Sequence, residues 1–99
     1  MALTPKQRAY LKSLAHPLKP ILQIGKEGVT DAVIGTIDGA FRTRELLKVK
    51  VLETAPSDAR AIGTGLAERV QGAQLVQVIG RTIVLYRRHP TQREITLPA

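Results

Sequence analysis

The sequence predicts a single α/β domain in which three helices and four strands follow the order α-β-α-β-α-β-β and the strands form one mixed sheet. The chain has 99 residues, 43% of them hydrophobic, which suits one domain over 1–99 with its core between about residues 4 and 97. Three segments repeat apolar residues with helical spacing, and four shorter ones are typical of strands. Helices in the first two connections imply parallel strand pairs and right-handed crossovers, whereas a short glycine turn makes the last pair antiparallel.

The first helix is expected over Pro5–Ala15. Thr4 is its predicted N-cap and Gln7 the capping-box partner, with a proline at the first helical position. His16 ends the helix because a residue that precedes proline disfavours the helical conformation. The apolar face consists of Leu3, Tyr10, Leu11 and Leu14, and the opposite face carries Arg8 and Lys12.

A short strand at Ile21–Ile24 leads to a second helix, which Thr30 caps and which extends to about Thr43. Asp38 and Arg42 are predicted to point outward and to pair in the favourable acid-first i, i+4 order. The apolar stripe of this helix consists of Val33, Ile34, Ile37, Ala40 and Phe41.

The second strand, Leu46–Leu52, alternates apolar and basic residues with the period of a half-buried strand. One side is predicted to face the core, and the other, which carries two lysines, is expected to stay at least partly open. The inward set is Leu47, Val49 and Val51, and the outward set is Lys48 and Lys50.

Ser57 is the predicted N-cap of a third helix that extends to about Gln71. Two glycines inside it, Gly63 and Gly65, each weaken the helix by about 1 kcal/mol relative to alanine. Gly63 borders the apolar face, so we expect it to allow close packing on the sheet. The buried stripe consists of Ala59, Ile62, Leu66 and Val70.

Two further strands, Leu75–Ile79 and Thr82–Arg87, flank Gly80 and Arg81 and predict a tight hairpin. In the tail that follows, prolines limit regular structure to at most a short edge strand near Ile95.

The net charge of +7, from 15 Lys and Arg against 8 Asp and Glu, favours a polyanionic partner. A merely soluble basic protein is the alternative on charge alone. A membrane surface is disfavoured, because no segment combines a strong apolar face with a purely basic polar face. With two Tyr, one Phe and no Trp, the chain lacks the rings on which many RNA-binding domains stack bases. We therefore expect any RNA contact to use backbone amides, cationic side chains and shape.

The absence of cysteine fits a reducing compartment and excludes thiolate catalysis and cysteine-based zinc sites. The longest apolar run, Ile83–Tyr86, is too short to span a bilayer, and the N-terminus does not resemble a signal peptide. These features predict a soluble cytoplasmic protein without a membrane partner.

The strongest candidate site is the loop Gly25-Lys26-Glu27-Gly28, which lies just ahead of a predicted helix. Its two glycines can adopt positive φ and present backbone amides, and the helix start favours an anion. Lys26 adds a mobile cation, and a GxxG loop of this kind clamps the nucleotide backbone in KH domains. A turn between strand and helix that needs glycine for conformation alone is the alternative.

The second candidate is a cationic set. Each member alone is more simply a solvated surface charge, so the functional hypothesis concerns the group. It consists of Arg8, Lys12, Lys19, Lys26, Arg42, Arg44, Lys48 and Lys50.

An enzymatic function is not indicated. His16 and His89 both precede prolines, and neither has a metal-ligand partner at a spacing such as HExxH. Gly63-Thr64-Gly65 lies within a helix and lacks the third glycine of a dinucleotide fingerprint. We expect no catalytic residue, no metal and no cofactor.

Four segments in order resemble the CRM domain, the chloroplast RNA splicing and ribosome maturation module. They are HPLKP at 16–20, GKEG at 25–28, ELLKVKV at 45–51 and VIGRTIVLYR at 78–87. In length the chain is most similar to the stand-alone bacterial form, the YhbY-like RNA-binding proteins, and the likeness covers about residues 4–97.

The resemblance implies a fold similar to the C-terminal domain of bacterial translation initiation factor three. It also implies RNA contact through the GxxG loop and association with precursors of the large ribosomal subunit, whereas plant relatives act in group II intron splicing. Carried over by residue, Gly25, Lys26 and Gly28 form the loop, and Lys19, Lys48 and Lys50 are the nearby basic positions. Glu27 does not fit phosphate contact, because an acidic side chain repels phosphate. Arg87 closes the Leu-Tyr-Arg motif and could equally have a structural role.

The function predicted is therefore a non-enzymatic, monomeric factor that binds ribosomal RNA during assembly of the large ribosomal subunit. Two alternatives remain: a basic adaptor that docks an acidic protein, and a general RNA chaperone without ribosomal preference.

Overall fold

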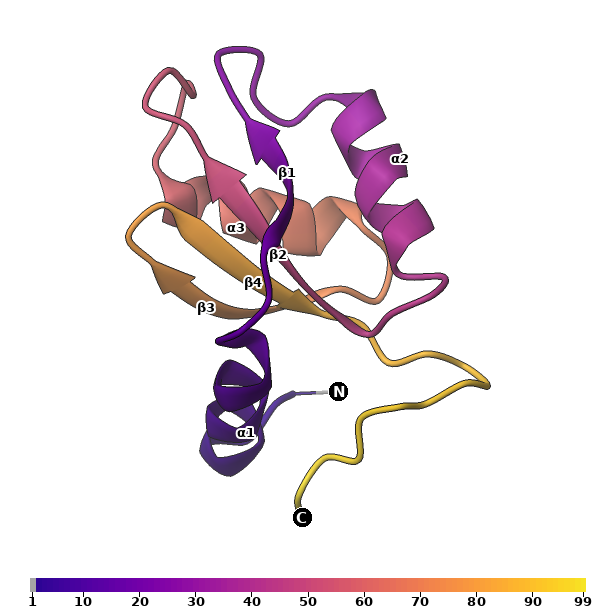
Figure 1. Cartoon of the computed structure of the whole chain (residues 1–99). Coiled ribbons are helices and arrows are strands. Elements are labelled where there is room, and N and C mark those ends of the chain that lie inside the picture. Colours follow the sequence, from indigo (N-terminus) through magenta and orange to yellow (C-terminus); the bar gives the residue numbers. More distant parts are fainter. Residues whose placement is uncertain (1) are drawn as a thin grey trace.

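The computed structural model describes residues 2–99. Three helices and four strands alternate in the predicted order, and the segment after residue 86 contains no helix or strand (Figure 1). The elements are α1 (Pro5–Ala15), β1 (Pro20–Ile24), α2 (Asp31–Ala40), β2 (Leu46–Val51), α3 (Ala59–Arg69), β3 (Gln74–Ile79) and β4 (Thr82–Tyr86).

The four strands form one mixed sheet in the order β1-β2-β4-β3. β1 is parallel to β2, and β4 is antiparallel to both of its neighbours. The expectation that β2 and β3, the two strands that α3 connects, pair directly with each other is wrong. β4 lies between them. The run Ile83–Tyr86 is buried on both faces, which explains why β4 takes an inner position rather than an edge.

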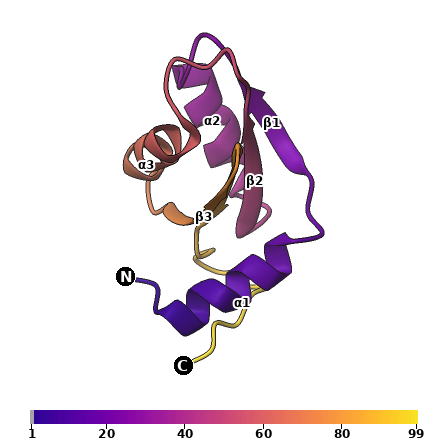
Figure 2. The ribbon, with the colours of Figure 1, turned by 90° about the vertical axis from the view of Figure 1, so that its left-hand side faces the viewer.

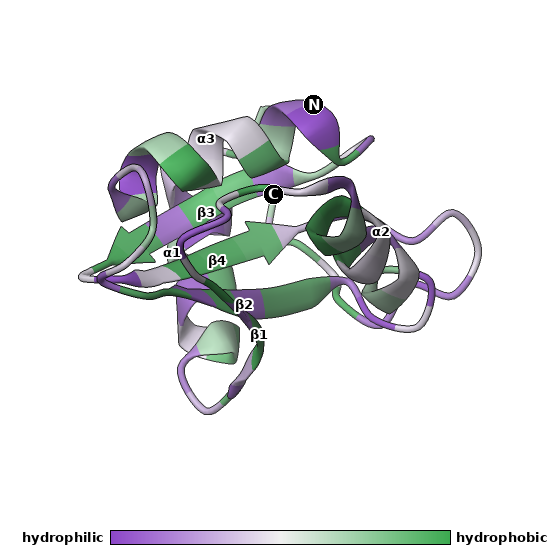
Figure 3. Cartoon of the chain, turned by 90° about the horizontal axis from the view of Figure 1, so that it is seen from above, coloured by the Kyte–Doolittle hydropathy of each residue, from purple (hydrophilic) through white to green (hydrophobic). Residues whose placement is uncertain are grey.

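The two faces of the sheet are covered differently. The main core forms between the sheet and α2 and α3, and Figure 2 shows these two helices on one side of the strands with α1 at the opposite end from the β1–α2 loop. A second, smaller core lies on the other face, where Leu11 of α1 packs with Leu46, Val76 and Tyr86. Burial is the main cause that raises the pKa of the Tyr86 phenol, and the nearby Glu45 carboxylate acts in the same direction. In Figure 3 much of β4 and β2 and much of α2 are green, the hydrophobic end of the scale.

The start of α1 follows the sequence prediction. Thr4 Oγ1 accepts from the Gln7 amide at 3.1 Å and Gln7 Oε1 accepts from the Thr4 amide at 3.0 Å, which completes the capping box. Thr30 caps α2 in the same way, through the Val33 amide at 3.2 Å. The lysine side of β2 is confirmed as the partly open one, with Lys48 half-buried and Lys50 exposed.

Two helix boundaries differ from the predictions. α2 ends at Ala40 rather than near Thr43, because the amides of Arg42 and Thr43 bond to carbonyls only three residues back. The N-cap of α3 is Asp58 and not Ser57: Asp58 Oδ1 accepts from the Ala61 amide at 2.8 Å. α3 then ends at Arg69, two residues before the predicted end.

Close packing explains the glycine inside α3. A Cβ on Gly63 would lie 3.1 Å from Leu75 Cδ1 and 3.4 Å from Ile83 Cγ2, so alanine would fit only if the Leu75 side chain shifted by a few tenths of an ångström. A Cβ on Gly65 would meet nothing within 4 Å. Within residues 2–99, no helix has the length and apolar character needed to cross a membrane.

The tail near Ile95 forms no strand. It folds back beside α1 as an extended segment, where Ile95 and Leu97 pack on the smaller core. A buried carboxylate holds it: Glu45, 3% exposed, accepts from the amides of His89, Glu94 and Ile95 at 2.7, 2.8 and 2.9 Å.

Candidate nucleic-acid interface

The Gly25–Gly28 loop is a tight turn at the end of β1. The Gly28 amide donates to the Gly25 carbonyl at 2.9 Å, which leaves Lys26 and Glu27 exposed at the corner. Of the two loop glycines, Gly28 has positive φ, at 67°, and Gly25 does not, so the expectation of positive φ at both glycines holds for one of them. Within residues 2–99, the amides of Lys26 and Glu27 have no hydrogen-bond partner, and both remain available to an anion.

A second loop supports this turn. A Cβ on Gly28 would lie 3.0 Å from Pro56 Cγ, and one on Gly25 would lie 3.6 Å from both Leu52 Cδ1 and Thr54 Oγ1. Residues 52–56 follow β2, so the parallel β1–β2 pair brings the two loops to the same end of the sheet. The loop at residues 52–56 therefore packs against the turn and stabilises its conformation.

The start of α2 is less available to an anion than the sequence predicts. Thr30 already accepts from one first-turn amide, and Asp31 places a carboxylate in the same turn. Asp31 pairs with Arg69 at 2.8 Å, and Arg69 also donates to the Val29 carbonyl at 2.9 Å. The anion-binding potential of this segment thus rests on the loop amides and Lys26, because the helix dipole is offset by Asp31.

Three predicted basic residues gather where α1 ends on the open side of the sheet. Lys12 and Lys48 line one groove of about 300 Å³, and Lys48 Nζ donates to the His16 carbonyl at 3.1 Å. Lys50 projects from the same face of β2, two residues along the strand. Lys12, Lys48 and Lys50 therefore form one group on this face of the sheet.

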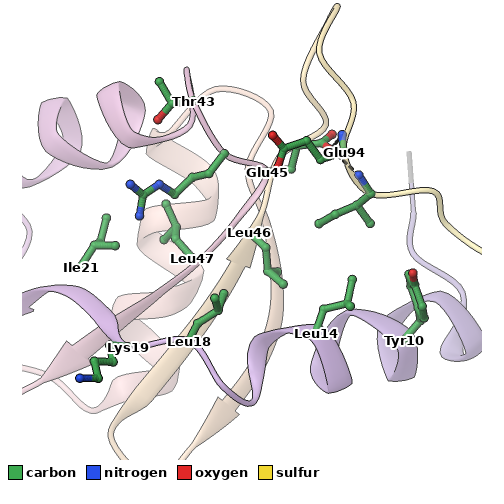
Figure 4. Close-up of a pocket in the computed structure, with 12 residues that line it drawn as sticks. Tyr10, Leu14, Leu18, Lys19, Ile21, Thr43, Glu45, Leu46, Leu47 and Glu94 are labelled. Carbon is green, nitrogen blue, oxygen red and sulfur yellow. Dashed lines mark hydrogen bonds between the residues drawn. The ribbon is translucent and has the colours of Figure 1, made fainter.

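Lys19 and Arg44 meet at another place, a groove of about 550 Å³ between α1, the start of β2 and the tail. In Figure 4 its apolar floor includes Leu14 and Leu46, and Lys19 lies at its margin. Both basic side chains are exposed. This groove lies at the end of β1 that is far from the Gly25–Gly28 loop, so the cationic set does not form one patch.

Two members of the set have structural contacts. Arg8 Nη1 donates to the carbonyls of Leu75 and Val76 at 2.6 and 2.7 Å and thereby fixes α1 on the irregular part of β3. Arg42 lies 3.8 Å from Asp38 as predicted, but Asp38 has a closer partner in Arg87, at 2.6 Å. Asp38 keeps 41% of its side chain exposed, so it lies outward as expected while it also bonds to Arg87.

Arg87 has a structural role. Its guanidinium bonds to the Asp38 carboxylate, which is the main cause that lowers the pKa of that carboxyl. It also donates to the Gln71 carbonyl at 3.2 Å and lies 5.0 Å from the Phe41 ring centroid. With 19% of its side chain exposed, it contributes little to the cationic surface.

Sequence reasoning missed Arg69 and Glu45. Arg69 holds the segment between the candidate loop and α2, although its position in the last turn of α3 indicates only a contact with the helix end. Glu45 stands beside two buried leucines, a position where an acidic residue requires partners, but its sequence neighbours do not identify the tail amides it binds.

Comparison with known proteins gives concordant matches. The model of the CRS1/YhbY (CRM) domain matches residues 3–87. A Bacillus subtilis protein named probable RNA-binding protein YqeI is 45% identical over 96 residues, covering 97% of this chain and 99% of its own. A Haemophilus influenzae protein named RNA-binding protein is 39% identical over 85 residues, or 86% of this chain and 85% of its own. The solution structure of SAV1595 from Staphylococcus aureus has a TM-score of 0.82 at 45% identity, and the match covers 98% of this chain and 100% of that one.

Proposed function

The chain belongs to the CRS1/YhbY (CRM) domain family, and on that premise we propose that it is a non-enzymatic protein that binds ribosomal RNA in precursors of the large ribosomal subunit and assists its assembly. The observation that supports RNA binding most directly is the Gly25–Gly28 turn, with two unpartnered amides and a lysine at an exposed corner. The names of the relatives, RNA-binding proteins, support the same class of partner.

The proposed contact is to the ribose-phosphate backbone. A phosphate oxygen accepts from the amides of Lys26 and Glu27, and the Lys26 ammonium adds a charge-assisted contact. Glu27 lies at the exposed corner, where its carboxylate can stay in solvent while its amide faces the phosphate. Lys12, Lys48 and Lys50 supply further phosphate contacts from the open side of the sheet.

Salt dependence distinguishes RNA from an acidic protein as the partner. If about four phosphates are neutralised on single-stranded RNA, a plot of log K against log salt has a slope of about −3. Fluorescence anisotropy with labelled ribosomal RNA fragments measures this slope. Absence of RNA binding would favour the adaptor function.

Substitutions in the loop test the site. Lys26→Ala and Gly25→Asp should weaken RNA binding and leave the thermal melt little changed, since Lys26 is exposed and a Cβ at Gly25 meets only ordinary contacts at 3.6 Å. Lys6→Ala is the matched control, an exposed lysine of α1 outside the proposed site. Equal loss in Lys6→Ala and Lys26→Ala would mean that the loop has no special role.

Sucrose-gradient fractionation of cell lysate tests the ribosomal part and the cytoplasmic location that it requires. The protein should co-migrate with large-subunit precursors, and cross-link sequencing should recover large-subunit ribosomal RNA. Recovery of many unrelated RNAs would instead identify a general RNA chaperone.

A further inference from the structure

The open face of the sheet carries a row of side chains that crosses all four strands. The pairing registers place Gln23 of β1 beside Lys50 of β2, Lys50 beside Thr82 of β4, and Thr82 beside Ile79 of β3. These residues lie on the face opposite the main core, because Val49 and Val51 point into that core from the same strand as Lys50. Adjacent strands are about 4.8 Å apart, so the row spans about 14 Å.

A second row runs beside the first, nearer to α1. Lys48 pairs with Val84 and Val84 with Gln77, and Lys48 and Gln77 line the same groove as Lys12. Beyond the end of α1 the face is uncovered: Gln23 and Lys50 are exposed, and Ile79 has 55% of its surface exposed. Gln23 is thus open to solvent, and Gln77, which is half-buried, lines the groove.

The part of this face that the tail does not cover carries charge of one sign. All eight acidic residues of the chain lie outside α1 and the four strands. Glu94 of the tail lines the groove that contains Lys19, and no acidic residue lines the groove that contains Lys12 and Lys48. Glu53, which follows β2 closely, is paired with Arg81 at 2.9 Å. Lys12, Lys48 and Lys50 therefore act on a ligand without an opposing carboxylate from these elements, and a polyanion is the ligand that this charge distribution favours.

The uncharged residues indicate which polyanion. An amide side chain both donates and accepts, which matches the edge of an unpaired base, whereas an acidic protein segment would need only the cations. The chain has few aromatic rings, so bases must be recognised by hydrogen bonds and apolar contact more than by stacking. Ile79 offers the apolar contact at the edge of the same row.

We propose that this open sheet face reads the bases of a single-stranded RNA segment, with Gln23 and Gln77 bonding to base edges and Lys12, Lys48 and Lys50 holding the phosphates. This inference rests on the proposed RNA-binding function and deepens it, because it adds a preference for certain bases to the binding of the ribose-phosphate backbone. The Gly25–Gly28 loop follows β1 directly, so the same strand of RNA can continue from this face to the loop.

The test compares oligoribonucleotides of uracil, cytosine and adenine of equal length on the full chain. The wild-type protein should rank them by affinity. Combined Gln23→Ala and Gln77→Ala substitution should narrow the ratio of the best to the worst Kd by about fivefold or more, with the salt slope unchanged. Combined Lys48→Ala and Lys50→Ala substitution should weaken all three alike and make the salt slope shallower by about 1.4, because two phosphate contacts are lost. Gln92→Ala, an exposed glutamine in the tail, is the matched control.

The outcomes distinguish base reading by this face from the proposed RNA-binding function. If RNA binds but the ranking survives loss of both glutamines, base reading by this face is wrong and the RNA-binding function stands. If no oligoribonucleotide binds and poly-glutamate binds instead, both are wrong. If the double variant melts at a lower temperature than the wild-type protein, the single variant Gln23→Ala is used to test base reading, because that side chain is exposed on an edge strand. Side-chain amide NMR signals of Gln23 and Gln77 should also shift when RNA is added.

Discussion

The guanidinium of Arg87 lies 2.6 Å from Oδ1 of Asp38, and this contact joins the end of β4 to α2. The same guanidinium bonds to the Asp38 carbonyl at 3.2 Å, so both the side chain and the backbone of one residue are held. Because a positive group faces the carboxyl only in the folded chain, folding favours its ionised form and lowers the pKa of Asp38.

Asp38 should therefore make stability sensitive to acid. Its contribution is complete above the ordinary carboxyl pKa of about 4 and is lost as the pH falls through the lower folded-state pKa. Asp38→Asn should reduce the free energy of unfolding by about 1 kcal/mol at pH 7, a moderate value because Asp38 is partly exposed. Urea denaturation at neutral and strongly acidic pH measures the difference between the two proteins. That difference should shrink in acid, and a constant difference would contradict the explanation.

Glu45 should control the order of the tail. Replacing it with alanine leaves three backbone amides without their acceptor and should cost about 2 kcal/mol of stability. Hydrogen exchange should quicken at Glu94 and Ile95, since both amides would become open to water. Glu45→Gln keeps one acceptor oxygen and should lose less. Unchanged protection of these two amides in Glu45→Ala would show that Ile95 and Leu97 hold the tail by packing alone.

Local patterns were sufficient to predict most of the fold. The helix starts at Thr4 and Thr30 depend on residues within one turn, and the alternation of Leu47, Lys48 and Val49 fixes which side of β2 is buried. Adjacent N-cap candidates such as Ser57 and Asp58 are harder to separate, because both side chains can accept from a first-turn amide.

The candidate site was predicted in part, because its arrangement depends on long-range pairing. The turn at Gly25–Gly28 follows from sequence, but the support from Pro56 depends on the parallel pairing of β1 with β2. In the same way, Arg8 and Lys12 appear equivalent on a helical wheel. Only the position of α1 on β3 shows that Arg8 is a structural contact while Lys12 stays exposed.

The two glycines of α3 should respond oppositely to alanine. Gly65→Ala meets open space and should stabilise the protein by up to about 1 kcal/mol, the helix-propensity difference. Gly63→Ala gains the same propensity, but Leu75 must shift to make room for the new methyl group, an overpacking cost of about 1–3 kcal/mol. Thermal melts should therefore place Gly63→Ala below Gly65→Ala. Equal melting temperatures would mean that the side chains of the sheet accommodate the added methyl group without loss of stability.

Alanine substitutions at Gly28 and Gly25 provide a second comparison. It distinguishes the effect of the backbone conformation of the loop from the effect of its charged side chain. Gly28→Ala requires a side chain at φ 67° and 3.0 Å from Pro56, so it should cost about 1–2 kcal/mol. Gly25→Ala has neither problem and should be nearly neutral in stability. If RNA binding needs the turn itself, Gly28→Ala should weaken binding more than Gly25→Ala, while the Lys26 side chain is present in both. Denaturation and anisotropy on the two variants measure these effects, and equal affinities would mean that RNA binding does not depend on the turn geometry.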